Sequence, residues 1–166
     1  MTAKRKFRLS RRTVSTLTIL LLLISGSLLW VFMQSQQKIS QAEAETVALV
    51  ELDYPVKTIN NFYWTSNART QFALDFVDKE GQQRYTIVDQ EDGDVAFYTP
   101  RDIISSEDAV SIAASEYKIA KLLNVRLGKL KDTVMWEVVF KDDKDNMQYY
   151  YINAKDGKWM QTIGNI

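Results

Sequence analysis

Carboxylates are the most numerous side chains in this chain that can do acid–base chemistry, and its 166 residues include no His and no Cys. That absence excludes His-dependent triads, thiol nucleophiles and zinc sites built on His or Cys. Hydrolysis by an acid pair needs two carboxylates that flank a cleft. The candidates Asp142, Asp143 and Asp145 fall instead in a predicted hairpin turn, where acids are ordinary solvated residues. We therefore expect a protein that is not an enzyme and needs no cofactor.

A second acidic group surrounds a glycine and resembles a calcium-binding loop. Its members are Asp89, Glu91, Asp92 and Asp94. An EF-hand loop has an acid at position 1 and Gly at position 6. Counting back from Gly93 places Val88 at position 1, which breaks the template. A solvated hairpin without a metal site is the better interpretation.

These acids lie within an internal repeat that organises the chain. Phe72–Thr99 aligns with Trp136–Ile163 without a gap, at a shift of 64 residues. A preceding helical segment matches at a shift of 65, where Ala44 and Ala48 fall on Ala109 and Ala113. Two copies of one helix-then-strands unit are therefore joined in tandem. A duplicated small unit favours a scaffold or a binding surface over a catalytic cleft.

The N-terminus combines a basic stub, residues 1–12, with a segment long enough to cross a membrane, residues 13–33. The basic residues of the stub are Lys4, Arg5, Lys6, Arg8, Arg11 and Arg12. Val14–Met33 then has 20 residues without a charge, or roughly 30 Å of helix. A cleaved signal peptide is the alternative, with Ser25-Gly26-Ser27 as small residues for cleavage. The apolar run continues to Met33, so an uncleaved anchor is favoured.

Charge asymmetry predicts the orientation of this anchor. Six basic residues precede the span and only Lys38 follows it closely, which places the N-terminus in the cytoplasm and about 130 residues outside. Those remaining residues carry 15 basic and 21 acidic side chains. We expect a single-pass cell-membrane protein that contacts the lipid bilayer, with an extracellular C-terminal domain. A mildly acidic ectodomain is a poor nucleic-acid binder, so no nucleic acid is expected as a partner.

Helices are predicted at the start of each copy. No Gly or Pro lies between Ser27 and Pro55, so the membrane helix can continue into the first copy; alternatively, Ser40 caps a new helix with Glu43. In the second copy Ser105 and Asp108 form a capping box. The apolar stripe behind it consists of Ala109, Ile112, Ala113, Tyr117 and Ala120.

Strand-like runs follow each helix and are separated by turn signals such as Asp92-Gly93. In the first copy they are 58–65, 71–77, 83–88 and 95–98. In the second copy they are 125–131, 134–141, 147–153 and 158–162. Without disulfides a unit of about 60 residues is marginal alone. We therefore expect the two units to pack together as one rigid, two-lobed ectodomain.

Alternation along the strands assigns side chains to faces. One face, predicted to pack against the helix, groups Phe72, Leu74 and Phe76 with Tyr85 and Ile87, and Trp136, Val138 and Phe140 with Tyr149 and Tyr151. The opposite face of the second copy contains Glu137, Val139, Tyr150 and Ile152. It is either the seam between the lobes or a partner-binding surface.

Aromatic residues mark the candidate partner-binding positions, since Tyr and Trp are favoured at protein interfaces. Tyr63 and Tyr150 are predicted to be exposed, whereas Trp64 and Trp159 are predicted to belong to the core. The candidate partner-binding residues are Tyr63, Tyr150, Val139 and Ile152.

The second copy resembles a PepSY domain. The resemblance rests on Ala109 and Ala113 of the helix, then Trp136-Glu137-Val138, then Tyr151-Ile152-Asn153-Ala154-Lys155-Asp156-Gly157-Lys158. PepSY sequences typically show an aromatic-Glu-Val strand and a closing strand that ends in Asp-Ala-x-Thr-Gly. Asn153 stands where Asp is usual, and Asp156 where Thr is usual. The Asp-Gly pair still suits a tight hairpin.

The whole chain is similar to the TseB-like (YpmB-like) family of Firmicutes, which has a basic stub, one transmembrane helix and two tandem PepSY-like units. The implied fold class is α+β: an N-terminal transmembrane helix and two PepSY/cystatin-like units, 34–99 and 100–166, each a helix packed on an antiparallel sheet. The resemblance implies an extracytoplasmic regulator of cell-wall (peptidoglycan) elongation with a membrane-anchored penicillin-binding protein as partner. An inhibitor or chaperone of an exported peptidase is the alternative, because PepSY units also occur in peptidase propeptides. An enzyme or small-ligand receptor would need a deep polar pocket.

Overall fold

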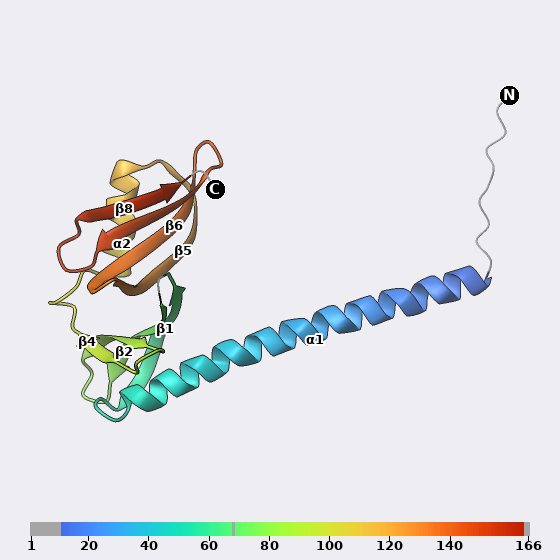
Figure 1. Ribbon diagram of the computed structural model, residues 1–166, viewed down its shortest axis with the longest axis horizontal. Helices are drawn as coiled ribbons and strands as arrows, with labels where there is room; N and C mark the ends of the chain where they lie inside the picture. The colour runs from blue at the N-terminus through green and yellow to red at the C-terminus, as the bar shows by residue number, and fades with distance from the viewer. Residues whose placement is uncertain (1–10, 68, 165–166) are drawn as a thin grey trace. The chain divides into compact units, whose positions relative to one another are not determined.

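The computed structural model describes residues 11–67 and 69–164, and the chain divides into two compact units between Gln41 and Ala42. The first contains most of a long helix, and the second contains the end of that helix and all the strands (Figure 1).

The long helix, α1, runs from Arg11 to Val50 without a break. Its most apolar 18-residue stretch has a mean hydropathy of 2.2, and the helix is long and apolar enough to be a candidate membrane span. Thr18 and Ser27 donate their hydroxyl protons to carbonyls one turn earlier, so both hydroxyls are satisfied inside the helix. Because α1 is continuous at Ser40, this residue does not cap a separate helix, and the continuous-helix alternative is the correct one.

The first lobe of the second unit is an antiparallel sheet in the order β1-β2-β3-β4. Its strands are β1 (Val56–Ser66), β2 (Thr70–Asp78), β3 (Gln83–Asp89) and β4 (Val95–Tyr98). The last turns of α1 cover one face of this sheet, where Val50 packs with Leu74 and Phe76. All four predicted strands are confirmed to within a few residues.

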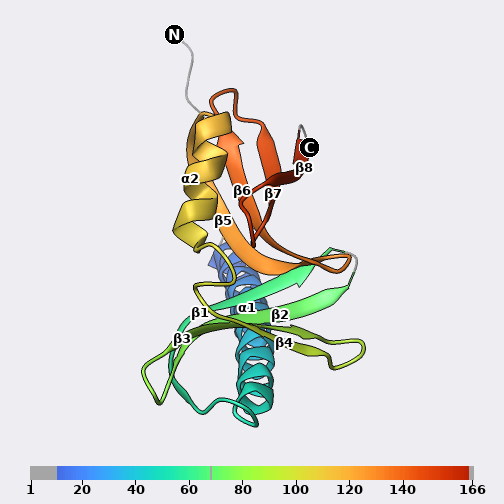
Figure 2. The same cartoon turned by 90° about the vertical axis from the view of Figure 1, so that its left-hand side faces the viewer.

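The second lobe consists of α2 (Ser106–Glu116) and an antiparallel sheet in the order β5-β6-β7-β8. The strands are β5 (Ile119–Leu130), β6 (Thr133–Asp142), β7 (Met147–Asn153) and β8 (Trp159–Gly164). Figure 2 shows α2 against one face of this sheet. The Ser105–Asp108 capping box is confirmed. Ala120 does not belong to the helix as predicted, because the chain becomes extended at Tyr117 and pairs with β6 from Ile119 onward.

The internal repeat is preserved in the backbone. In both copies the hairpin after the third strand closes in the same way: the Gly93 N–H donates to Asp89 O at 3.0 Å and the Gly157 N–H donates to Asn153 O at 2.9 Å. Both glycines have a positive φ, 74° and 71°, which explains why Gly is needed there. The closing hairpin predicted from the PepSY resemblance is therefore present twice.

The predicted faces are correct for the second strand of each sheet and wrong for the third. Phe72, Leu74 and Phe76 are opposite Val88, Thr86 and Arg84 in the register, so Tyr85 and Ile87 lie on the other face. Likewise Trp136, Val138 and Phe140 are opposite Ile152, Tyr150 and Gln148, which places Tyr149 and Tyr151 on the other face. The hairpin turns set this register, and a one-residue difference moves every side chain of a strand to the opposite face.

The two lobes share the larger of two hydrophobic clusters, as expected for units too small to be stable alone. Tyr63, Tyr85 and Ile87 of the first sheet belong to the same cluster as α2 and the helix-covered face of the second sheet. Trp136 lies at the centre of this cluster. Its ring is edge-on to Tyr63 and Tyr85, with centroids 5.6 and 6.3 Å away. Its indole N–H donates to Ile104 O at 2.8 Å.

Candidate functional site

The four predicted partner-binding side chains are all buried. Tyr63 is 8 % exposed, Tyr150 3 %, Val139 4 % and Ile152 0 %. The prediction that Tyr63 and Tyr150 are exposed is therefore wrong. Tyr63 packs against Trp136, and Tyr150 lies against the ring of Tyr117. Burial raises the pKa of both tyrosines, and the carboxylate of Asp75 raises that of Tyr63 further.

These four residues also do not form one surface. Tyr150 and Ile152 lie on the face under α2, opposite Val138 and Trp136 in the register, whereas Val139 alternates to the other face. All four are at most 8 % exposed, although parts of Tyr63 and Tyr150 line hollows on the surface. Of the residues predicted to set the topology, Lys4, Arg5, Lys6 and Arg8 lie outside the described residues, while Arg11 and Arg12 form the first turn of α1.

The Glu of the aromatic-Glu-Val strand forms a buried ion pair. Glu137 is 2 % exposed and pairs with Arg126 of the neighbouring strand β5. Asn67, from the turn between β1 and β2, donates to its other carboxylate oxygen at 3.4 Å. One oxygen of Glu137 is bound within the second sheet and the other to the first lobe, so this acid is positioned for structure.

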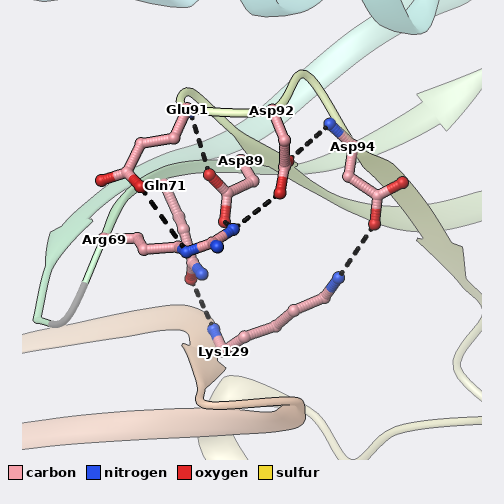
Figure 3. A network of polar contacts seen from close by, with 7 residues as sticks. All are labelled: Arg69, Gln71, Asp89, Glu91, Asp92, Asp94 and Lys129. Atoms are coloured by element: carbon pink, nitrogen blue, oxygen red, sulfur yellow. Dashed lines mark hydrogen bonds and ion pairs between the residues drawn. The ribbon is translucent and has the colours of Figure 1, made fainter.

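An ionic network occupies the junction of the two lobes, where Asp89, Glu91, Asp92 and Asp94 form the hairpin that resembled a calcium loop (Figure 3). Arg69 lies within reach of three of these carboxylates, at 3.3 Å from Asp89, 3.6 Å from Glu91 and 2.6 Å from Asp92. Its guanidinium occupies the place where a bound cation would need to sit. The predicted hairpin is confirmed.

Two further contacts of this network join the lobes directly. The Lys129 N–H of β5 donates to Gln71 Oε1 of β2 at 2.7 Å, and Lys129 Nζ lies 3.9 Å from Asp94 (Figure 3). The N–H of Asp94 and the guanidinium of Arg69 hold the pKa of Asp92 below its usual value. Because these side chains already form ion pairs and hydrogen bonds with one another, few of their polar groups are free to bind a ligand. We therefore infer that the network holds the two lobes together.

The surface best suited to bind another molecule lies between β8 and the end of α2. A groove of about 400 Å³ is lined there by Glu116, Tyr117, Tyr150, Trp159 and Thr162. We call it the β8 groove. Trp159 is 61 % exposed, and its indole N–H donates to Thr162 Oγ1 at 2.9 Å, which holds the ring along the strand. A large exposed aromatic side chain beside a groove is typical of a protein-binding site.

Sequence reasoning missed this surface because it assigned Trp159 to the core, as it did the 39 % exposed Trp64. The register, with its one shift in β8, places Trp159 on the helix side, opposite Ile152. However, α2 ends at Glu116 and leaves the ring uncovered. The repeat contained a signal for this surface, because the position equivalent to Trp159 in the first copy is the much smaller Val95.

Comparison with known proteins agrees with this architecture. The profile of the PepSY family, described as "Peptidase propeptide and YPEB domain", matches residues 103–158. This segment is similar in sequence to a PepSY domain. It comprises α2, β5, β6 and β7, and it ends at the residue before Trp159. No curated protein sequence matches the chain.

One solved structure shares the fold over most of the chain. It is the YpmB protein from Bacillus subtilis, with a TM-score of 0.62 and 19 % sequence identity, covering 72 % of this chain and 94 % of that one. The likeness at this identity is one of fold. Together with the match to the PepSY profile it confirms the resemblance to YpmB-like proteins and the α+β fold class.

Proposed function

We propose that this protein is a membrane-anchored, extracytoplasmic binding protein that modulates peptidoglycan elongation through a penicillin-binding protein. The observation that carries the proposal is an exposed aromatic groove beside a PepSY domain, in a chain whose long helix includes an apolar candidate span. The resemblance to the YpmB-like family supplies the partner class. The shared core between the lobes supports a role as a rigid platform for that partner.

The orientation in this proposal follows from charge. Six basic residues and no acids precede the apolar run, which favours a cytoplasmic N-terminus. The lobes then lie outside the membrane. A tether of this kind keeps the lobes close to any partner anchored in the same membrane, and the raised effective concentration lets a modest interface suffice.

In-membrane photo-crosslinking tests this proposal. A photoreactive amino acid replaces Ile163, which is 43 % exposed on β8, and a second variant carries it at Glu80, in the turn between β2 and β3, as a matched control. Mass spectrometry of the adducts from native membranes should identify a penicillin-binding protein at Ile163 and not at Glu80. Adducts that lack such a protein overturn the proposed function.

A second candidate, an inhibitor or chaperone of an exported peptidase, is favoured by the description of the PepSY family as a peptidase propeptide domain. The same crosslinking experiment separates the two candidates. An exported peptidase captured at Ile163, together with slower peptidase activity when the purified protein is added, would replace the first proposal with this one.

A further inference from the structure

We infer that β8 and its groove bind an extended segment of a partner protein that adds to the second sheet as a fifth strand and places a Lys or Arg side chain in the groove. This inference rests on the proposed function only in taking the partner to be a protein. Three features carry it: the edge of β8, the aromatic walls of the groove and the charge at its rim.

The edge of β8 is open, and its residues after the register shift near Trp159 pair regularly with β7. Among the residues that the structure describes, β8 pairs only with β7. Trp159–Gly164 contains no charged residue and no Pro, which are the usual devices that prevent another strand from pairing at an edge. A row of free backbone donors and acceptors is the template that strand addition uses.

The other edges of the two sheets differ in this respect. Each of the edge strands β1 and β5 contains two register shifts relative to its neighbour, whereas β8 contains one, near its start, and such bulges disfavour further pairing. β4, the equivalent of β8 in the first lobe, has four residues and is followed by Pro100 after Thr99. Pro100 corresponds in the repeat to Gly164, so the first lobe blocks the edge that the second lobe leaves available.

The side chains at this edge favour a cationic occupant. Trp159, Tyr117 and Tyr150 line the groove, and the faces of Trp and Tyr rings attract Lys and Arg side chains. Glu116 forms no ion pair within the described part of the chain and is exposed at the last residue of α2. The last turn of α2 contains no basic residue, so the negative end of the helix adds to the charge of Glu116.

The spacing of side chains along β8 connects its open edge with the groove. Trp159 and Thr162 point to the helix side of the sheet, as their register partners Ile152 and Tyr150 show. A fifth strand beside β8 presents alternate side chains on this same side. One of them therefore lies next to the indole of Trp159 and within the groove, where a basic group reaches Glu116.

A displayed library of random nine-residue peptides, selected against the full chain in detergent micelles, tests this inference. We expect the enriched peptides to share one Lys or Arg with β-branched neighbours. Synthetic copies of an enriched peptide should bind at least tenfold more weakly to Trp159→Ala and about fivefold more weakly to Glu116→Gln. N-methylation of alternate peptide nitrogens, which blocks strand pairing, should abolish binding.

Two matched variants serve as controls. Trp64→Ala removes an exposed Trp of the first lobe, and Glu80→Gln removes an exposed acid there; both should leave peptide binding unchanged. Failure to enrich peptides, enrichment without a basic residue, or equal binding to Trp159→Ala overturns the inference. N-methylated peptides that bind as well as the unmodified ones overturn strand addition. A confirmed peptide site with no penicillin-binding protein crosslinked at Ile163 would refute only the proposed function.

Discussion

Phe72 and Trp136 occupy the same position in the two copies of the repeat, yet their partners differ. Phe72 packs within its own lobe, against the rings of Phe62 and Trp64. Trp136 contacts Tyr63 and Tyr85 of the other lobe and also ties its indole N–H to Ile104 O. The repeat thus keeps the position apolar for the fold, while the larger side chain of the second copy joins the lobes.

The neighbouring position shows the same division. Ala73 of the first copy, fully buried in the shared core, corresponds to Glu137 of the second, which pairs with Arg126 and Asn67. β4 and β8 differ in another way. Here the second lobe leaves a sheet edge open, whereas at the two positions above it buries a larger side chain at the lobe junction. At these positions the difference between the copies affects the lobe junction and the β8 groove.

Removing Trp136 should have the largest effect on stability. Trp136→Ala deletes a fully buried ring and leaves both lobes facing a cavity, so we expect a loss of about 3–5 kcal/mol in the free energy of unfolding. Urea unfolding of the full chain, followed by circular dichroism, measures it. Trp159→Ala, at an exposed position, should change stability by less than about 0.5 kcal/mol. Similar losses for the two variants would refute the bridging role of Trp136.

Replacing Glu137 by the residue of the first copy should have the next largest effect. Glu137→Ala leaves the partly buried guanidinium of Arg126 without its carboxylate, and we expect a loss of about 2–3 kcal/mol. The double variant Glu137→Ala/Arg126→Met removes both charges and should regain part of that loss. A double variant that is no better than Glu137→Ala alone would show that the cost comes from packing.

The close approach of β1 and β5 can be tested at Gly128. A Cβ at this residue would lie 2.8 Å from Thr65 Oγ1, so Gly128→Ala must push the two strands apart at a cost of about 1–2 kcal/mol. Adding Thr65→Ala removes the obstructing atoms and should restore most of the stability. Thermal unfolding of the three variants provides the measurement, and a simple sum of the two single effects would mean that the strands do not meet there.

Local signals predicted the elements of this fold well. The capping box at Ser105 and the turns at Gly93 and Gly157 depend on residues a few positions apart, and each is found where the sequence placed it. The facing of the third strands was mispredicted because the register depends on the turn that joins two strands. The observed register differs from the predicted one by one residue, so the side chain of Tyr150 lies in the core and that of Tyr149 lies on the opposite face.

The candidate site was less accessible to sequence reasoning, for a physical reason. Whether Trp159 is covered depends on where α2 ends, 43 residues earlier in the chain, and no local pattern states which helix turn lies above it. Tyr63 was misjudged for a similar reason, since it is the other lobe that covers its ring. The burial of these two side chains depends on long-range contacts, and the sequence of a single repeat gives no information on such contacts.

Asp78 and Asp142 are equivalent residues of the β2–β3 and β6–β7 turns, and their pH dependence provides the finest test of the comparison. Burial would raise the pKa of both acids, but hydrogen bonds outweigh it and lower them. Asp78 accepts from Arg84 Nε at 2.6 Å, whereas Asp142 accepts from the neutral amide of the equivalent Gln148 at 3.1 Å. Asp78 is therefore held by an ion pair, whereas the side chains that bind Asp142 are neutral amides.

A folded pKa below the unfolded value means that the unfolded chain binds more protons as the solution becomes acidic, so the stabilisation is present above about pH 4 and is lost as the pH falls through the folded pKa. Asp78→Asn and Asp142→Asn should each make the acid-induced loss of stability shallower between pH 5 and 2. Added salt at pH 7 should weaken the wild-type protein through Arg84, and Asp78→Asn should be less sensitive to it than Asp142→Asn. Urea unfolding across pH and salt measures both effects. Equal salt dependence in the two variants would mean that the charge of Arg84 contributes no more than the amide of Gln148.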